Sequence, residues 1–343
     1  MAKNLLAFLA VVIFLFSFRE ARKVLFPKPS YFPKPEYNFK NNPLDSNAIK
    51  LGRYLFFDPV LSKDSTISCA SCHSPFNAFA HTDHSLSHGI NDTIGRRNAP
   101  ALFNLAWQNL FMWDGAINHL DFQALAPLSS PAEMGESLNH VLQKINKQTF
   151  YEKAFKAAFD SNEISGERFL KALSQFQLTL ISANSKYDRV RLEKEQFTEQ
   201  EKRGYLLFSQ NCVSCHIEPL FSSYEFESNF LPLNAFLNDN GRVEVTLNEK
   251  DSMKFKVPSL RNLSFSFPYM HDGRFTKLNE VLNHYTDSTV QAQFLKSINK
   301  SPIYLSGDEK VDLIAFLLTL NDKEFVFNPK HRFPKELLTK TKE

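Results

Sequence analysis

Glycine is scarce in this chain, and the shortage bears on its fold class. Only 10 of the 343 residues are glycine, whereas a typical share is roughly 7%. Tight hairpin turns rely on glycine at positive φ, so a sandwich built from many hairpins is disfavoured. The 34 phenylalanines supply large apolar side chains for a core. This composition favours a helical protein.

The chain also lacks a strong excess of either charge. Its 40 Lys and Arg nearly balance its 37 Asp and Glu, giving a formal net charge of +3. It has no long run of Lys or Arg, and a nucleic-acid binder would need such a basic surface. These features exclude nucleic acid as a partner. The length suits about two domains of roughly 150 residues each.

A hydrophobic run of full transmembrane length is missing, but a shorter one stands near the amino terminus. Residues 5–18 are apolar except for Ser17, and Lys3 precedes them. About 14 residues suit a signal peptide better than a membrane span, which needs roughly 20. No clear cleavage site follows, so we expect residues 1–25 to be a signal peptide or an uncleaved anchor that tethers the chain to the inner membrane. Either alternative indicates a periplasmic protein.

Composition predicts the remaining boundaries. Four prolines lie between Pro27 and Pro35, so we expect residues 26–43 to form an extended tether. A densely charged stretch near residues 190–200 indicates a boundary between two domains. The predicted layout is an N-terminal domain at 44–195, a C-terminal domain at 196–325 and a C-terminal tail at 326–343.

The chain has only four cysteines, and all of them lie in two copies of the pattern C-x-x-C-H. The copies are Cys69, Cys72 and His73, and Cys212, Cys215 and His216. This pattern attaches a c-type haem: the thiols bind its vinyl groups, and the His ligates the iron. A four-cysteine zinc site, two redox C-x-x-C motifs or two short disulfides would not need the adjacent His. With 10 His in the chain, chance would place one after both pairs about once in a thousand. We therefore predict two covalently bound c-type haems.

The sequence around the two motifs repeats itself. Residues 52–56 precede the first motif and residues 204–208 precede the second, and both stretches are predicted to be helical. Residues 176–180 (FQLTL) then match residues 316–320 (FLLTL) downstream. The repeat predicts an all-α fold of two cytochrome c-type domains, each around one haem.

Between Leu51 and about Leu320, the motifs resemble those of the bacterial di-haem cytochrome c peroxidase family, which includes a methylamine-utilisation branch. The matching segments are 51–59 (LGRYLFFDP), 97–100 (RNAP), 113–115 (WDG), 257–262 (VPSLRN) and 268–273 (PYMHDG). The resemblance implies reduction of hydrogen peroxide to water with electrons from a small redox protein, a cytochrome c or a cupredoxin. It also implies that the N-terminal haem is peroxidatic and that the C-terminal haem receives the electrons.

The resemblance further assigns residues near the peroxidatic haem. Glu133 matches a distal catalytic glutamate, Gln123 a distal glutamine, and Trp113 a tryptophan that relays electrons between the haems. A carboxylate suits this chemistry, because splitting peroxide requires moving a proton from one oxygen to the other, and an amide stabilises charge on the departing oxygen. Without the resemblance, Ser130, Pro131 and Glu133 would be a helix capping box. Gln123 would be an ordinary polar helix residue, and Trp113 a core residue.

The chain departs from the peroxidase pattern at the C-terminal haem. The peroxidases carry a Met ligand at the position where this chain has Tyr285. A tyrosinate there resembles the methylamine-utilisation branch, and such an anionic donor stabilises ferric iron. His284 is the chief competing ligand and Met270 a weaker one, while a core aromatic is the structural alternative for Tyr285.

Three histidines, His81, His84 and His88, lie in the loop after the first haem motif. His88 is nearest to the position of a distal His in the family and is a candidate ligand of the resting N-terminal haem. The alternatives are that His88 is a solvated loop residue and that this haem keeps an open position.

A calcium ion is a further implication of the resemblance. Asn98, Ser266 and Pro268 match positions that hold calcium between the domains, through an Asn side chain and backbone carbonyls. Ser266 stands where the family commonly has Thr. Asn98 as a plain loop residue is the alternative.

Two other functions compete with peroxide reduction. One is oxidation of a residue in a protein partner, as in the methylamine-utilisation relatives. The other is non-catalytic electron transfer by two saturated haems, with Glu133 serving only as a helix cap. The sequence is compatible with both a monomer and a homodimer.

Overall fold

The computed structural model describes residues 25–296 and 301–339, and within these ranges the chain is helical with long irregular connections. The regular strands of this part are one short antiparallel pair, β1 (Phe226–Glu227) and β2 (Phe255–Lys256). The expectation of a helical protein is confirmed. The apolar run at residues 5–18 lies outside the described residues, and no helix within them is long and apolar enough to cross a membrane.

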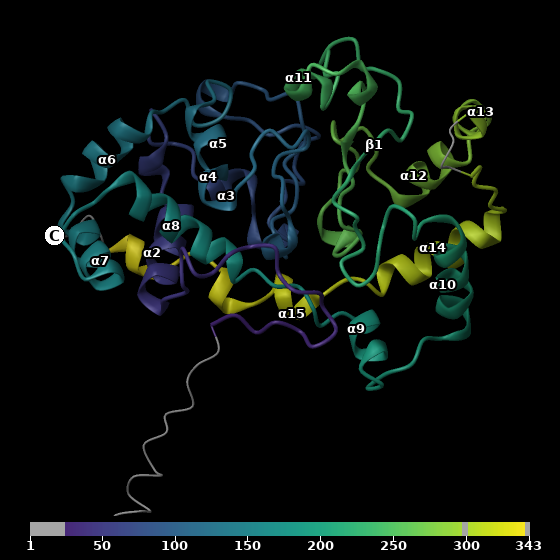
Figure 1. Cartoon of the computed structure of the whole chain (residues 1–343), viewed down its shortest axis with the longest axis horizontal. Coiled ribbons are helices and arrows are strands. Elements are labelled where there is room, and N and C mark those ends of the chain that lie inside the picture. Colours follow the sequence, from purple (N-terminus) through teal and green to yellow (C-terminus); the bar gives the residue numbers. More distant parts are fainter. Residues whose placement is uncertain (1–24, 297–300, 340–343) are drawn as a thin grey trace, which may run out of the picture.

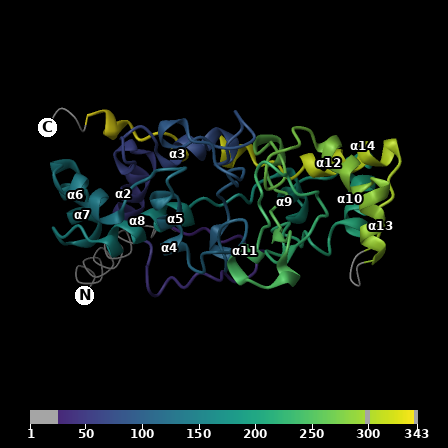
Figure 2. The ribbon, with the colours of Figure 1, turned by 90° about the horizontal axis from the view of Figure 1, so that it is seen from above.

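The helices gather into two lobes that lie side by side (Figures 1 and 2). The first lobe contains α2 (Ser46–Phe57), α3 (Cys69–Cys72), α4 (Leu120–Gln123), α5 (Leu125–Ser129), α6 (Leu138–Asn146), α7 (Thr149–Phe159) and α8 (Gly166–Leu178). The second contains α9 (Lys186–Arg191), α10 (Glu199–Asn211), α11 (Val243–Thr246), α12 (Leu278–Tyr285), α13 (Ser288–Lys296) and α14 (Gly307–Leu318). A last short helix, α15 (Lys323–Val326), leads back from the second lobe toward the first (Figure 1).

Each lobe is centred on a pair of helices that cross closely, and the two pairs are equivalent in the sequence repeat. In the first lobe α2 crosses α8, and in the second α10 crosses α14. A glycine stands at each crossing. A Cβ atom on Gly52 would lie 1.9 Å from the carbonyl oxygen of Ala172, and one on Gly204 would lie 2.0 Å from that of Asp312. Two of the few glycines are therefore used where helix backbones touch.

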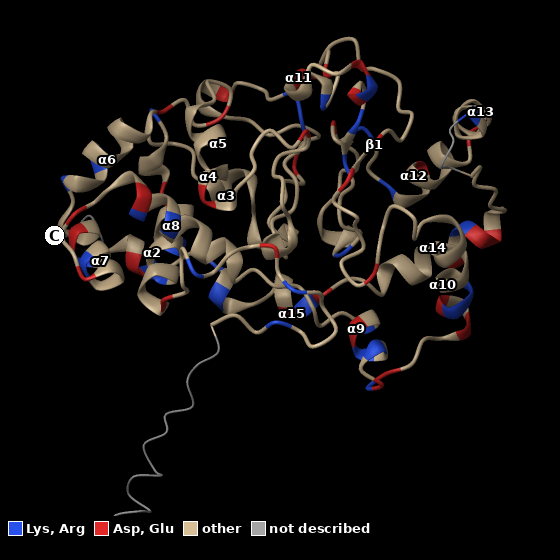
Figure 3. Cartoon of the chain, in the orientation of Figure 1, with Lys and Arg blue, Asp and Glu red and all other residues tan. Residues whose placement is uncertain are grey.

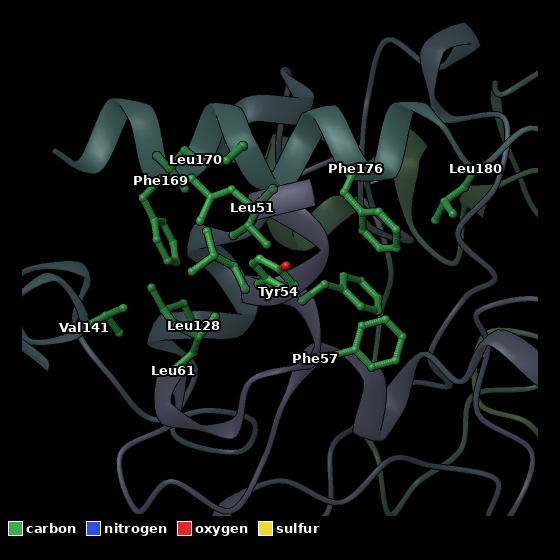
Figure 4. Close-up of a cluster of buried hydrophobic side chains, with 14 of the residues drawn as sticks. Leu51, Tyr54, Phe57, Leu61, Leu128, Val141, Phe169, Leu170, Phe176 and Leu180 are labelled. Carbon is green, nitrogen blue, oxygen red and sulfur yellow. The ribbon is translucent and has the colours of Figure 1, made fainter. Parts of the chain in front are cut away.

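Phenylalanine fills the core beneath each crossing. In the first lobe, Leu51, Tyr54 and Phe57 of α2 point toward Phe169 and Phe176 of α8 (Figure 4). The rings of Phe56 and Phe176 have centroids 5.2 Å apart. Their repeat equivalents in the second lobe, Phe208 and Phe316, are also 5.2 Å apart. The repeat in the sequence is thus a repeat of core packing.

The proline-rich segment at 26–43, which we expect to be a tether, packs against the body instead. Phe32 is 3% exposed, and its ring meets the edge of Trp107 with centroids 5.0 Å apart. The Trp107 indole donates a hydrogen bond to the carbonyl oxygen of Pro33. Proline keeps this segment extended, but the aromatic residues between the prolines bury too much apolar surface to stay in solvent.

The C-terminal residues, expected as a tail at 326–343, also pack onto the body as far as Leu337. We call residues 322–338 the C-terminal strap. Phe325 of the strap is buried in the core of the first lobe, and His331 donates its Nδ1–H to the carbonyl oxygen of Phe325 at 2.9 Å. Arg53 of α2 donates its Nε–H to the carbonyl oxygen of Arg332. The end of the chain therefore completes the first lobe.

Two arginine–aspartate pairs connect distant parts of the chain. Arg97 of the first lobe binds Asp239 of the second through Nε and Nη2, at 2.6 and 2.8 Å. Arg261 and Asp188, both fully buried, form a second two-pronged pair at 2.7 and 2.8 Å. Elsewhere, charges of both signs are interspersed over the lobes (Figure 3). Breaking either pair would leave a charge in a buried place, which is costly.

The helix crossing in the second lobe leads to a stability prediction. Gly204→Ala would place a methyl group against a backbone carbonyl, so α10 and α14 would have to separate. We expect unfolding free energy to fall by about 2 kcal/mol or more, despite the better helix propensity of Ala. Gly307→Ala is the control, because a Cβ atom added there would have no other atom within 4 Å. Equal urea midpoints for the two variants would contradict this account.

A pH prediction follows from His331 in the C-terminal strap. Burial lowers the pKa of His331 from 6.5 to about 4. The unfolded chain therefore takes up this proton first, and stability falls as the pH drops from 6.5 to about 4. Over this whole pH range the free energy of unfolding should fall by about 3 kcal/mol.

His331→Gln should flatten the dependence of the urea midpoint on pH over this range. Gly307→Ala, which retains every histidine, should keep the wild-type dependence. An unchanged pH dependence in His331→Gln would show that the strap histidine is not the group responsible.

Candidate haem sites

The first C-x-x-C-H motif forms one turn of helix and the residue that ends it. Cys69 and Cys72 are the first and last residues of α3, and His73 is its C-terminal cap. Ser68 precedes the turn, and its backbone N–H bonds to the Ser71 hydroxyl. Both thiols are free. The turn therefore holds the two sulfur atoms and the imidazole in one compact unit.

His73 is held in a single orientation by the loop that follows it. Its Nδ1–H donates to the carbonyl oxygen of Phe79 at 2.8 Å. Ala78 and Phe79 adopt left-handed backbone angles, with φ of +52° and +60°, and this turn directs the carbonyl back toward the ring. Burial lowers the pKa of His73 to about 4. The imidazole is consequently neutral, and the lone pair on Nε2 is available to a metal.

The second motif repeats this arrangement. His216 has Nδ1 at 3.1 Å from the carbonyl oxygen of Phe221 and at 3.2 Å from that of Pro258. Burial lowers its pKa to about 4 as well. Phe221 again has a left-handed backbone, with φ of +54°. An anchored Nδ1–H and a free Nε2 are what a metal-bound His requires.

The four cysteines fit haem attachment better than the alternatives. They are free thiols, so the two short disulfides are not formed. In the part of the chain that the structure describes, which includes both motifs, no three His, Cys, Asp or Glu residues are placed to hold a metal ion. A shared zinc site is therefore excluded. Two thiols beside one neutral imidazole, found twice, are the groups that a c-type haem needs.

Glu133 lies close to the first motif, in a turn that follows α5. Residues 131–134 form this turn, and the next helix, α6, begins only at Leu138 with Ser137 as its cap. The helix-cap alternative for Glu133 is therefore wrong. Burial raises the pKa of Glu133, and a hydrogen bond from Ser130 partly offsets the rise.

The charge of Glu133 acts on both thiols of the first motif. The pKa of Cys69 is raised by burial, by Cys72 and further by Glu133. The pKa of Cys72 is raised by burial and, less strongly, by Glu133. A half-buried carboxyl group thus stands beside the place where the first haem would attach.

Gln123 and Trp113 belong to segments that contact each other, and Trp113 also reaches the second lobe. Gln123 ends α4, and its amide donates to the Met112 sulfur at 3.7 Å. Trp113 follows Met112 in the chain, and its indole donates to the carbonyl oxygen of Asn98 at 2.9 Å. Its own carbonyl accepts from the backbone N–H of Lys256 in β2. Trp113 is therefore fixed where the two lobes meet.

The loop after the first motif brings its three histidines together. His81, His84 and His88 stack in order, with ring centroids 5.7 and 4.7 Å apart. His88 contacts Asp92 through Nδ1 at 2.5 Å, and the His88 carbonyl lies 3.9 Å from the Cys72 sulfur. The stack was not expected from the sequence. The loop lies over the first motif, and haem ligation by His88 stays a prediction.

Two candidate ligands of the second haem, His284 and Met270, hydrogen-bond to Asn229, and the third, Tyr285, lies near it. Tyr285, the last residue of α12, lies close enough to Cys212 and Cys215 that they raise its pKa, after the larger effect of burial. His284 points elsewhere, because its Nε2–H donates to the carbonyl oxygen of Asn229 at 2.8 Å. The sulfur of Met270 accepts from the Asn229 amide at 3.3 Å.

The three predicted calcium ligands are held by other partners. Asn98 donates through its side-chain amide to the carbonyl oxygen of Ser85 and through its backbone to that of His271. Ser266 donates through its hydroxyl to the carbonyl oxygen of Asn262. Pro268 is buried. None of these contacts joins the three to one another, so the calcium site stays a prediction.

One repeat in the sequence escaped the motif analysis. Residues 112–115 (MWDG) correspond to residues 270–273 (MHDG), and the two segments share their backbone conformation. Met112 and Met270 have φ of +69° and +74°, and the glycines that end the two segments have φ of +74° and +66°. His271 thus occupies the position of Trp113 in the second lobe, where it stacks on Phe255 with centroids 3.7 Å apart. The M-x-D-G pattern was the signal that could have found it.

Comparison with known proteins agrees with this geometry. The family model described as di-haem cytochrome c peroxidase matches residues 46–196. Methylamine utilization protein MauG of Methylorubrum extorquens is 36% identical over 312 residues, which are 88% of this chain and 84% of that protein. Cytochrome c551 peroxidase of Nitrosomonas europaea is 34% identical over 288 residues, 81% of each chain.

A solved structure extends the likeness to the fold. The crystal structure of a MauG-like protein associated with microbial copper homeostasis has a TM-score of 0.81 and 31% sequence identity. It covers 90% of this chain and 99% of the other. The likeness therefore spans both lobes and both haem motifs, and not only the segment that the family model matches. With two neutral, anchored histidines beside paired thiols, this chain belongs to the di-haem cytochrome c peroxidase family.

Proposed function

We propose that this protein reduces hydrogen peroxide to water, using two c-type haems, one in each lobe. The observation that carries the proposal is the half-buried Glu133 carboxyl group beside the thiols of the first motif. When bound, the haems supply redox-active iron that passes electrons from a donor protein to peroxide. Each peroxide consumes two electrons and two protons and yields two water molecules.

Glu133 is the residue that moves the proton. Peroxide cleavage requires a base that takes a proton from one oxygen and returns it as an acid to the other. Burial raises the pKa of Glu133, which brings its two protonation states closer in free energy near neutral pH. Gln123 supports this step as an amide donor that stabilises charge on the departing oxygen.

Trp113 is the proposed relay for electrons between the lobes. Its indole is bonded to Asn98 and its carbonyl to Lys256, so it is fixed from both sides of the contact. The Arg97 pairs with Asp114 and Asp239 hold the same contact together. A rigid aromatic side chain at this place gives a fixed electron-transfer path between the two motifs.

Oxidation of a residue in a protein partner is the second candidate function. Tyr285 favours it, since this side chain lies beside both thiols of the second motif. An anionic phenolate ligand stabilises ferric iron and lowers the reduction potential of the haem. A low potential disfavours reduction of this haem by a high-potential cytochrome donor. In this second function peroxide is the oxidant, and the partner residue supplies the two electrons that the donor protein would otherwise provide.

The location, the electron donor and the calcium ion are inferred from the sequence. We infer a periplasmic location from the apolar run at residues 5–18, and a small cytochrome c or cupredoxin as electron donor. A calcium ion held by Asn98, Ser266 and Pro268 would add a link between the lobes. Asn98 already joins them, through its backbone bond to His271.

Replacing Glu133 tests the proposed reaction. Glu133→Gln keeps the shape of the side chain but cannot accept the proton, so peroxidase turnover should fall by about 10²–10⁴-fold. Covalent haem content should stay at two per chain, measured by the pyridine haemochrome spectrum. Glu163→Gln, a 68% exposed carboxylate of the same lobe, is the control. Full turnover in Glu133→Gln would reject the catalytic role.

Replacing Tyr285 tests the second haem. Tyr285→Phe removes only the phenol oxygen, so the absorption and EPR spectra of this haem should change and its reduction potential should rise. The control is Tyr304→Phe, on a 73% exposed tyrosine. If Tyr285→Phe has the wild-type spectra and potential, Tyr285 is a core aromatic and not a ligand.

A further inference from the structure

Asn229 follows β1 in an irregular loop of the second lobe, beside the candidate ligands of the second haem. Its carbonyl oxygen accepts from His284 at 2.8 Å. Its side-chain amide donates to the Met270 sulfur at 3.3 Å, and the side chain of Tyr285 lies near it. One residue therefore hydrogen-bonds to the imidazole and the thioether that compete with the Tyr285 phenol.

The hydrogen bonds of Asn229 reduce the ability of His284 and Met270 to bind iron in different ways. The bond to His284 uses the Nε2–H, which fixes that nitrogen as a proton carrier with no lone pair for iron. The ring of His284 also lies against Phe275, with centroids 5.8 Å apart. Asn229 thus holds His284 away from the second motif through its backbone.

The amide of Asn229 acts on Met270. Its N–H points at a lone pair of the Met270 sulfur, a weak acceptor, and draws on electrons that the sulfur would otherwise give to a metal. The left-handed backbone of Met270 and the bridge between Tyr269 and Phe275 hold that sulfur in place.

We propose that Asn229 is the positioning residue that selects Tyr285 over Met270 and His284 as the ligand of the second haem. This inference rests on the proposed ligation by Tyr285. Asn229 does not bind the haem. It acts by engaging the thioether and the imidazole, which leaves Tyr285 as the available donor.

The test uses the purified protein with both haems attached. Asn229→Leu keeps a side chain of similar size but removes the amide donor. The Met270 sulfur then loses its hydrogen bond and is released. We expect part of the second haem to acquire methionine ligation, seen as the near-infrared charge-transfer band of methionine-bound ferric haem. The midpoint potential of that haem should rise in parallel.

A double variant shows whether Met270 is the incoming ligand. In Asn229→Leu with Met270→Leu, the near-infrared band should vanish and the tyrosinate spectrum should return. Met270→Leu alone should keep the wild-type spectrum and potential, because the thioether is not the resting ligand. Asn283→Leu, the same change at an exposed site on α12, should also have no effect. Haem content and circular dichroism establish that each variant is folded.

The outcomes separate this inference from the assignment of Tyr285. If Tyr285→Phe changes the spectrum but Asn229→Leu changes neither spectrum nor potential, Asn229 has no selecting role. A lower potential with an intact tyrosinate spectrum in Asn229→Leu would also overturn the selection, because Met270 would then not have replaced Tyr285. If Tyr285→Phe leaves the spectrum unchanged, the proposed ligation itself fails.

Discussion

The hydrogen bond from each haem-motif histidine to a backbone carbonyl is the interaction on which the rest of the structure depends. His73 donates to Phe79, and His216 lies against Phe221 and Pro258. Each bond fixes the tautomer and leaves Nε2 free. The carbonyls of Phe79 and Phe221 belong to residues with left-handed backbones. This conformation costs a non-glycine residue about 1 kcal/mol or more.

The core of each lobe holds these strained residues in place. The side chains of Phe79 and Phe221 are fully buried. Phe79 packs among Phe56, Phe176 and Phe325, and Phe221 packs against Tyr187 and Phe208. The orientation of each imidazole is therefore set by hydrophobic packing. The phenylalanine-rich core thus fixes the carbonyls that orient the two haem-motif histidines.

The sequence predicts the parts of the molecule that local patterns encode. The helices around Gly52 and Gly204 follow from apolar spacing, and the haem motifs follow from the adjacent Cys and His residues. Whether a helix starts at Glu133 did not follow from its neighbours, because Ser130 and Pro131 also fit a helix start, and only the turn at 131–134 shows that none does. The stack of His81, His84 and His88 depends on loop conformation, which spacing along the chain does not determine.

Long-range packing accounts for the other differences. Proline content indicates extended backbone but not whether that backbone is covered, so Phe32 and its contact with Trp107 could not be anticipated. Asn229 carries no motif, since its hydrogen bonds with Met270 and His284 join it to residues 41 and 55 positions away. Such convergence exists only in the folded chain.

The C-terminal strap has a consequence for how the protein is made. Phe325 and Val326 belong to the core of the first lobe, and Arg53 is bonded to Arg332 near the end of the chain. These residues leave the ribosome after the entire second lobe. The first lobe, although it begins the chain, is therefore the last of the two to be completed. The two haem-binding halves cannot mature as independent modules in the order of their synthesis, and a chain cut between them would give an incomplete first half.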